Sequence, residues 1–436
     1  MSSQNATHDD SEVETNRTSP TWLKPELFEP LLRQTFDLFK GIRTFKVGAG
    51  TKPGDNYATV MLCINIEVEL TDNTTEAVSY MLKIPHASET FDDMFGKTNI
   101  FSIERNMFTK YLLEFKDLYR KAGLELEFGA KCYELDVKQD YVLLENLRTR
   151  GFQTSNRLKG LDKEHTMGVL KKLAQWHAAS AVRVAEIGPY PEDQLSGMFT
   201  EENRALAEKM TEGMLKYVLK SVETIEGHES YYNDIKNMKG QLYENAMQLG
   251  IADPNEFNVL NHGDCWTNNI MFQHDASGNI LETYLVDYQM VKYGSVAQDL
   301  LYFLISSPQL ELKVNEFDFF VKYYHDQLIT HLKLLNYSKR LPSLIDIHTV
   351  LLKYGIWGYC TACGVMSGVL LESTDAAKFD NLFTDTPEAE EFKTLLFSGE
   401  TYRRHIKVVM PWLQNRGALQ INNAKSEKKS VSSTID

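Results

Sequence analysis

The sequence has few cysteines, no long apolar run and no cluster of basic residues. Its five cysteines are an odd number without regular spacing, so no disulfide framework of the kind found in small secreted proteins is expected. No stretch approaches the roughly 18 apolar residues of a transmembrane helix. The polar segment 1–20 has no apolar core of a signal peptide. We therefore predict a cytoplasmic protein with free thiols and no membrane span.

The charge balance excludes nucleic acid as a main partner. Sixty acidic and 46 basic side chains give a net charge of −14, and no Lys/Arg-rich run is present that would bind a phosphate backbone. The composition is 43% hydrophobic, which is ample for a large core, and we expect a monomer.

One stretch of the second half of the chain points to a chemistry. Residues 261–269 read Asn-His-Gly-Asp-Cys-Trp-Thr-Asn-Asn, which contains H-x-D-x-x-x-x-N, and a later apolar run ends at Asp287. In a kinase, one carboxylate accepts the proton of the attacking hydroxyl, while an amide oxygen and a second carboxylate hold Mg²⁺ on ATP. We predict Asp264 as the proton acceptor, and Asn269 and Asp287 as metal ligands. The alternative is an ordinary turn rich in Gly, Asp and Asn.

Two charged residues upstream would complete such a site. Lys83 lies in an otherwise apolar predicted strand, where a charge is costly unless it is paired. Glu104 lies in the helix predicted to follow. Kinases use this order for the ion pair that positions a lysine on the phosphates of ATP. The alternatives are a lysine that reaches water from an edge strand and a solvated helical glutamate.

Two backbone segments are candidates for nucleotide contact. Residues 48–59 carry several glycines between predicted strands, and glycine lets backbone N–H groups approach phosphate. This loop is neither a Walker A loop nor a strict G-x-G-x-x-G, and a plain hairpin is the alternative. The extended segment 143–147 would bind the adenine edge through its backbone. The candidate nucleotide-binding residues are Gly54, Asn56, Tyr57, Lys83, Glu145 and Leu147.

Three further residues near the motif have competing interpretations. Asp299 begins an apolar helix soon after Asp287, where it either caps that helix or holds the loop around Asp264. His262 is expected to brace backbone rather than to transfer protons. Trp266 is expected to pack.

The hydrophobic periodicity predicts an α+β fold with two lobes between two disordered tails, 1–20 and 422–436. Residues 21–147 are rich in predicted strands and contain one key helix at about 99–114. Residues 148–421 are mainly helical, with strands only at 257–288. This is the bilobal protein-kinase-like order, with ATP between the lobes. The predicted helices of the larger lobe are 163–186, 200–222, 230–249, 295–306, 313–335, 343–370 and 386–414.

These residues resemble those of the insect ecdysteroid kinase-like family, which overlaps the CHK kinase-like group and is related to choline kinases and aminoglycoside phosphotransferases. The resemblance runs from about residue 25 to 420 and rests on residues 54–59, 83–85, 104, 144–147, 173–180, 262–269, 286–289 and 411–417. It implies ATP- and Mg²⁺-dependent phosphorylation of a small-molecule alcohol, ecdysteroids being the founding substrates. Asn146 departs from the more usual Asp, and residues 46–53 match weakly.

The substrate remains the open question at this level. A small-molecule kinase is favoured over a ligand-binding pseudokinase, because the charged set is intact. It is favoured over a protein kinase, because the segment from 288 to 299 is too short for a protein-substrate activation loop. A steroid alcohol is preferred to choline or an aminoglycoside on the resemblance. The segment 354–366, which mixes aromatics, small residues and Met, is either the lining of an apolar pocket or a packed core helix. Its Cys360 and Cys363 are expected to pack rather than to bind metal.

Overall fold

The computed structural model describes residues 19–51, 59–85, 100–191, 201, 203–372, 374 and 379–420. Most of the predicted tail 1–20 and the whole predicted tail 422–436 lie outside these ranges. So do Gly54, Asn56 and Tyr57. Among the described residues, no helix combines the length and the apolar character that crossing a bilayer requires.

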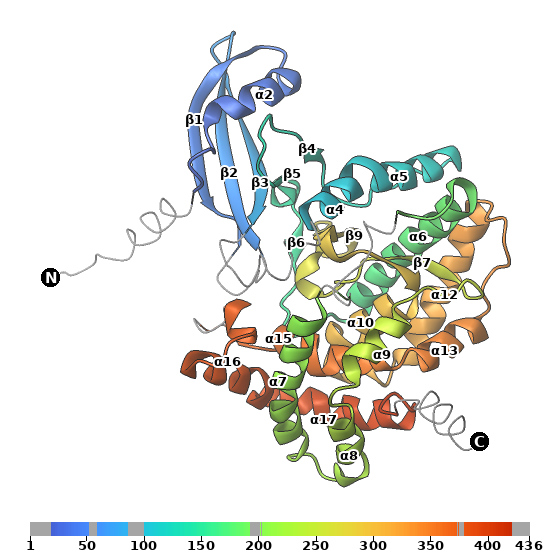
Figure 1. The fold of residues 1–436 in the computed structure, drawn as a ribbon. Helices are drawn as coiled ribbons and strands as arrows, with labels where there is room; N and C mark the ends of the chain where they lie inside the picture. Colours follow the sequence, from blue (N-terminus) through green and yellow to red (C-terminus); the bar gives the residue numbers. More distant parts are fainter. Residues whose placement is uncertain are drawn as a thin grey trace, which may run out of the picture.

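A five-stranded antiparallel sheet forms the smaller lobe (Figure 1). Its long second strand alternates buried Leu62, Ile64, Ile66 and Val68 with more exposed residues, as the two-residue period of a strand dictates. These apolar side chains pack with those of α2 (Glu29–Thr35) in a separate small core. The strands, in spatial order, are β1 (Phe39–Ala49), β2 (Thr59–Leu70), β3 (Thr75–Pro85), β5 (Val142–Glu145) and β4 (Cys132–Tyr133).

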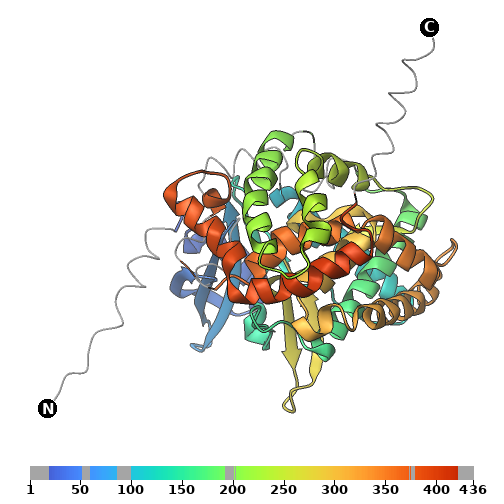
Figure 2. The same ribbon diagram turned by 90° about the horizontal axis from the view of Figure 1, so that it is seen from below.

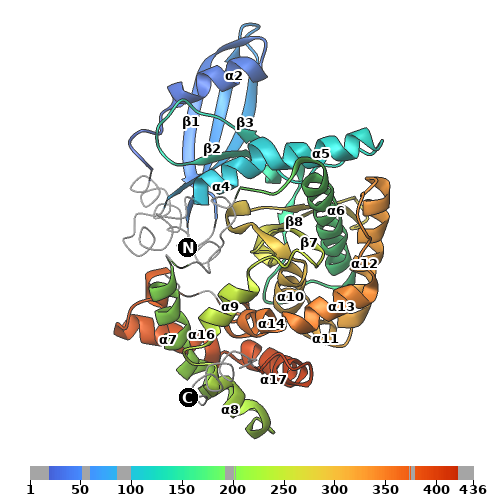
Figure 3. The ribbon, with the colours of Figure 1, turned by 45° about the vertical axis from the view of Figure 1, so that its right-hand side comes forward.

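A helical segment connects the sheet to the larger lobe. It consists of α4 (Ile100–Asn106), a π turn (Met107–Tyr111) and α5 (Leu112–Lys121). It runs between the sheet and α6 (Lys163–Ile187), against which α5 packs (Figure 3). The predicted helix ends too early, at about 114, because buried Phe115 and Tyr119 continue its apolar face.

The larger lobe is mainly helical, and α6 lies at its centre with α12 packed along it. Three predicted helices are each broken into shorter ones. Gly240, at φ +71°, accounts for one break, since it separates α8 from α9 in a left-handed conformation. The helices after α6 are α7 (Arg204–Val222), α8 (Glu229–Asn237), α9 (Leu242–Leu249), α10 (Ala297–Ser306), α11 (Leu310–Lys313), α12 (Phe317–Leu334), α13 (Leu344–Lys353), α14 (Ile356–Cys360), α15 (Met366–Val369), α16 (Pro387–Ser398) and α17 (Glu400–Asn415).

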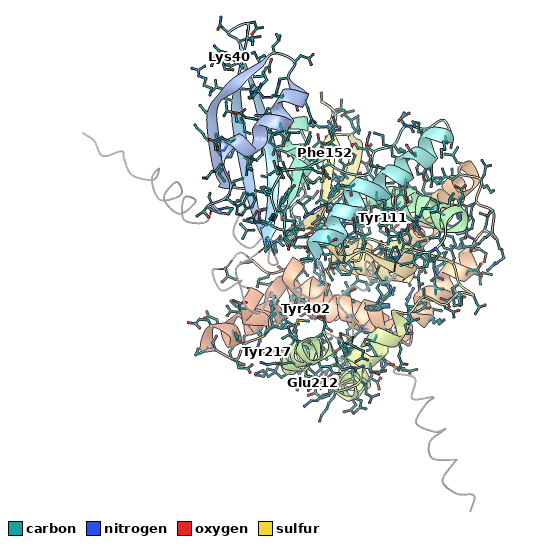
Figure 4. All side chains as sticks on the ribbon, turned by 45° about the horizontal axis from the view of Figure 1, so that its top comes forward. Lys40, Tyr111, Phe152, Glu212, Tyr217 and Tyr402 are labelled. Atoms are coloured by element: carbon teal, nitrogen blue, oxygen red, sulfur yellow. The ribbon has the colours of Figure 1, made fainter. Side chains whose placement is uncertain are left out.

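Helices α7, α16 and α17 pack together at the end of this lobe far from the sheet, where α17 crosses α7 (Figures 1 and 2). Tyr217 of α7 donates to Glu390 of α16 at 2.6 Å. Tyr402 of α17, which is labelled with Tyr217 in Figure 4, donates to the carbonyl of Ala362 at 3.1 Å. The first bond ties α7 to α16, and the second ties α17 to the π turn (Thr361–Val365) that joins α14 to α15.

Two small antiparallel sheets interrupt the helices. One pairs β7 (Asn258–Asn261) with β10 (Lys292–Ser295), and the other orders β6 (Gln153–Thr154), β8 (Ile270–His274) and β9 (Ile280–Leu285). Neither β6 nor β10 was predicted, because two and four residues are too few to show alternation. The described chain therefore has the predicted α+β, protein-kinase-like fold, a small β-rich lobe followed by a large, mainly helical one.

Candidate active site

Lys83 joins the two lobes. It lies on β3, and its ammonium nitrogen is 2.6 Å from Glu104 Oε2 on α4 and 2.7 Å from Asp287 Oδ1 after β9. Lys83 and Glu104 are only 3% and 1% exposed, so the pair is shielded from water. Burial alone would lower the pKa of Lys83, but the carboxylates of Asp287 and Glu104 outweigh it and hold the pKa above its usual value. Lys83 is therefore a fixed cation.

Glu104 is held from two sides. Its Oε2 accepts from Lys83, and its Oε1 accepts from the backbone N–H of Tyr288 at 3.2 Å. Burial raises the pKa of its carboxyl, and Lys83 opposes that rise. The alternatives of a water-reaching lysine and a solvated glutamate are wrong, because both side chains are buried and paired.

Asp264 lies in the loop between β7 and β8. Its Oδ1 accepts a hydrogen bond from the hydroxyl of Tyr302 on α10, and its Oδ2 accepts from Asn269 Nδ2 at 2.8 Å. Burial and, next, the charge of Asp287 raise the pKa of Asp264 to about 7, although the two hydrogen bonds oppose the rise. A carboxyl with a pKa near the working pH is suited to accept a proton from a hydroxyl.

Asp299 on α10 holds this loop. Its two oxygens accept from the backbone N–H groups of His262 (2.7 Å) and Gly263 (2.9 Å), and His177 Nε2 lies 3.1 Å from it. The carboxylate makes no cap of its own helix, whose N-cap is Val296. Of the two interpretations of Asp299, the one in which it holds the loop is therefore correct.

The backbone of the loop admits only glycine at position 263. Gly263 has φ +78°, and a Cβ there would come 2.0 Å from the carbonyl oxygen of Met290. His262 braces the same region as expected, because its Nε2–H donates to the carbonyl of Val286 at 3.0 Å. Burial lowers the pKa of His262, which keeps the imidazole neutral and suits it to this bracing role rather than to proton transfer.

Asp287 follows β9 in a left-handed conformation, with φ +70°. Such a conformation is uncommon for any residue other than glycine, and residues held in it gather at functional sites. The turn aims its carboxylate back toward Lys83, while Tyr288 remains buried in the core. Five predicted residues therefore line one cavity, although they are spread over more than two hundred positions of the chain: Lys83, Glu104, Asp264, Asn269 and Asp287.

Of the residues predicted to contact the nucleotide, Glu145 and Leu147 do not point their side chains into the cavity beside Lys83. The side chain of Glu145 accepts from Arg150 at 2.8 Å, and its backbone N–H donates to the carbonyl of Lys131. Leu147 is buried in the core. Neither side chain lines the cavity beside Lys83, whereas those of Leu144 and Met61 do. Sequence reasoning missed Met61, whose only signal was its place beside the glycine-containing loop.

A cavity of about 570 Å³ extends from these charged residues into the larger lobe. Besides the charged residues, it is lined by Trp266 and by residues of α7, the start of α9, the α14–α15 segment and α16. Its walls there are largely apolar. Prominent lining residues are Met210, Met214, Val218, Trp357, Phe392 and Leu396.

The segment 354–366 combines the two interpretations offered for it. Trp357, Cys360 and Val365 line the cavity, whereas Ile356 and Ala362 are buried in the core. Burial raises the pKa of Cys360 to about 12, so its thiol stays protonated. Cys360 and Cys363 both line the cavity and carry free thiols.

The fold and the geometry together define the class. A buried lysine–glutamate pair links the sheet to its helix, and a carboxylate-bearing loop and a further carboxylate lie beneath it, as in protein-kinase-like phosphotransferases. The chain belongs to the ecdysteroid kinase-like family, whose model matches residues 53–337, well over half of the sequence. None of the curated proteins matches the chain. Family membership supports a small-molecule kinase in general terms, and the match ends before the helices α13 to α17.

Proposed function

We propose that the protein transfers the γ-phosphate of ATP, with Mg²⁺, to a hydroxyl of a small lipophilic alcohol such as an ecdysteroid. The observation that carries this proposal is the continuity of one cavity. At one end Lys83, Asp264 and Asp287 converge, and at the other the walls are apolar. A phosphate donor and an apolar alcohol bound in the same cavity would meet at Asp264.

The donor atoms suit Mg²⁺, which prefers oxygen ligands. Asp287 offers carboxylate oxygens. Asn269 uses its Nδ2 for hydrogen bonds to the carboxylate and the carbonyl of Asp264, at 2.8 and 3.0 Å, which leaves its Oδ1 for a cation. When bound, the ion would neutralise charge on the phosphates. Lys83, positioned by Glu104, would bind the phosphates directly.

Asp264 would accept the proton of the alcohol. As the alcohol oxygen bonds to the γ-phosphorus, the bond from that phosphorus to the β,γ-bridging oxygen breaks and ADP leaves. The hydroxyl proton passes to Asp264 Oδ1 or Oδ2. Tyr302 and Asn269 hold the carboxylate in position, and Asp299 holds its backbone.

The walls favour an apolar alcohol over choline. A quaternary ammonium would need a desolvated cage of aromatics and carboxylates. Of the carboxylates that α7 brings to the cavity, Glu208 is paired with Arg204 and Glu212 is exposed. The five cysteines are all free, which supports a reducing, cytoplasmic location, and we propose a monomer that needs no nucleic-acid partner.

The test is transfer of labelled γ-phosphate to ecdysteroids in competition with choline and an aminoglycoside. We expect a phosphorylated steroid and no phosphorylated choline, and Asp264→Asn provides the inactive control. Phosphorylation of choline alone would move the protein toward the choline kinases. Binding of MgATP and steroid without transfer to any alcohol would identify a ligand-binding pseudokinase.

A further inference from the structure

Two glycines in one wall of the cavity are not required by the protein's own structure, as far as the described residues show. Gly364 lies in the π turn after α14, Gly368 lies in α15, and both line the cavity. A Cβ at either position would have no described atom within 4 Å, and neither residue has a positive φ. Neither the packing of the described chain nor the backbone conformation therefore demands glycine here.

The neighbouring glycines of the same segment differ in both respects. A Cβ at Gly355 would come 2.9 Å from the Cβ of Ala418, and a Cβ at Gly358 would come 2.8 Å from Leu413 Cδ2. These two glycines thus allow close packing against α17 and the residues after it, and neither lines this cavity. Within this segment, the glycines that face the core are explained by packing, whereas those that line the cavity are not.

A glycine in a helical segment has an energetic cost that another benefit must offset. It destabilises a helix relative to alanine, because glycine loses more backbone freedom on folding, and it is favoured where a backbone must come close to a ligand. Gly364 is exposed and Gly368 is partly exposed, although both belong to the wall of a cavity. Their backbone is therefore accessible to a molecule in the cavity, and the space left by the two missing side chains is available to it.

The wall around the two glycines is held in place. They are four residues apart, so they lie on nearly the same face of the segment, roughly 6 Å apart along its axis. The hydroxyl of Ser367 donates to the carbonyl of Gly364 at 2.7 Å, and Arg157 donates to the carbonyl of Val369, also at 2.7 Å. Helix α15 also packs against α16, which lines the same cavity (Figure 1). A ligand would thus meet a fixed backbone at two adjacent positions without side chains.

We propose that Gly364 and Gly368 set the width of the cavity, so that it admits an alcohol with a broad, rigid skeleton of fused rings that lies against their bare backbone. A side chain at either position would favour a slim, linear alcohol instead. A flexible chain can bend around a side chain, whereas a rigid ring system cannot, although the rigid molecule loses less conformational freedom on binding. This inference rests on the proposed function for the reaction, but not for the binding.

The position of the two glycines along the chain fits a role in substrate selection. The family match ends at residue 337, so it covers the charged residues of the reacting centre but not this wall. The chemistry and the width of the cavity thus depend on different parts of the chain, and one can be changed without the other.

The test compares an ecdysteroid with decan-1-ol, a linear alcohol. Binding is measured by calorimetry without ATP, and phosphate transfer is measured with MgATP. Each of Gly364 and Gly368 is changed to Ala and, separately, to Leu, and melting temperatures are recorded. Gly213 is the matched control, because it lies within α7, has no described atom within 4 Å of where its Cβ would be, and does not line the cavity.

We expect the wild type to bind the ecdysteroid more tightly than decan-1-ol. Each Ala variant should weaken ecdysteroid binding about tenfold, as a change of one carbon in a fitted apolar pocket does, and each Leu variant should weaken it more. Affinity for decan-1-ol should change less than about twofold. The Ala variants should melt about 1–2 °C higher than the wild type, because helical glycine is replaced without a clash. Gly213→Ala should gain the same stability and leave both affinities unchanged.

Three results would reject the proposal. Lower melting temperatures of Gly364→Ala and Gly368→Ala, with that of Gly213→Ala raised, would show that the protein's own packing requires the two glycines. Undiminished ecdysteroid binding by the Leu variants, or an equal loss for both alcohols, would show that they do not set the width. A wild type that binds no ecdysteroid would show that the cavity does not admit fused rings.

This inference and the proposed kinase activity can fail separately. Phosphate transfer to an alcohol whose binding is indifferent to the substitutions at Gly364 and Gly368 would retain the kinase and reject the selection by width. Ecdysteroid binding that weakens as these side chains grow, without transfer to either alcohol, would retain the selection and reject the kinase.

Discussion

Replacing Lys83 by Met removes the only cation that contacts Glu104 and Asp287 within the described chain. Glu104 would keep the hydrogen bond from the Tyr288 N–H, at 3.2 Å. Its carboxylate is only 1% exposed, so neither a cation nor water would balance its charge. Asp287 is more exposed and can be solvated from the cavity. The damage should therefore centre on Glu104, and it should appear in stability as well as in ATP binding.

Breaking a buried ion pair by removing one partner costs about 3–5 kcal/mol. We expect Lys83→Met to lower the free energy of unfolding by that amount at pH 8. Glu104→Gln should cost about 1–3 kcal/mol, because Lys83 still has its ion pair with Asp287 and the glutamine amide fills the same space as the carboxylate. The double variant has no unpaired buried charge at this position. Its loss should be at least about 1 kcal/mol smaller than the sum of the single losses.

The loss should also depend on pH. Burial already raises the pKa of Glu104 above 4.5, and without Lys83 the pKa should rise further. A carboxyl whose pKa is higher in the folded than in the unfolded protein lowers stability at high pH. This loss grows as the pH rises from the pKa of the unfolded state through the pKa of the folded state. Lys83→Met should therefore be less destabilised at pH 5 than at pH 8, and Glu104→Gln should remove this difference between the two pH values.

The assay is urea unfolding of the wild type and the three variants at pH 5 and pH 8, with titration of MgATP at pH 8. Lys83→Met should weaken MgATP binding, and Glu104→Gln should do so more mildly, since Glu104 acts through Lys83. Strict additivity of the two losses, or a pH-independent cost of Lys83→Met, would refute the reasoning that the two residues form a coupled buried pair.

Three further changes test the rest of the site. Asp287→Ala should weaken MgATP binding in calorimetry, and excess Mg²⁺ should partly restore it; unchanged affinity would remove Asp287 from the metal. Asp264→Asn should leave MgATP binding intact but lower the rate about 10²- to 10⁴-fold. Because the pKa of Asp264 is about 7, the rate of the wild-type enzyme should fall as the pH drops below neutral. The raised pKa also means that the stability of the wild-type protein should decline as the pH rises from 3.8 to 7. Asp264→Asn should lack that decline in stability. Gly263→Ala should cost several kcal/mol in thermal unfolding. Gly151 has φ +80°, and among the described residues no atom lies within 4 Å of where a Cβ would be. Gly151→Ala should therefore cost only about 1–2 kcal/mol, and equal losses in the two variants would contradict the clash with Met290.

The central charged residues could be predicted because each carries a local signal. A lysine in an apolar strand and a helical glutamate after it form a recognisable order, and a loop of Gly, Asp and Asn between short strands forms another. The structure brings these residues together. Tyr302 was missed, although it lies three residues after Asp299 and so on the same face of α10. That spacing was the available signal.

The breaks within the helices and the shortest strands could not be read from periodicity. Residues 343–370 are apolar almost throughout, so their pattern does not show where α13 ends, where α14 begins or where the π turn lies. The pairing of β10 with β7 depends on a partner about thirty residues away, and four residues carry too little pattern to reveal it.

The sequence by itself determined the class of chemistry, because strand and helix periods, turn residues and the order of charged groups are properties of neighbouring positions. Only the tertiary structure decided what the cavity can hold. Its walls combine α7, α9, α10 and α16 with the α14–α15 segment. Side chains so far apart along the chain become neighbours only through packing, and whether a buried lysine has a partner depends on every element that packs around it.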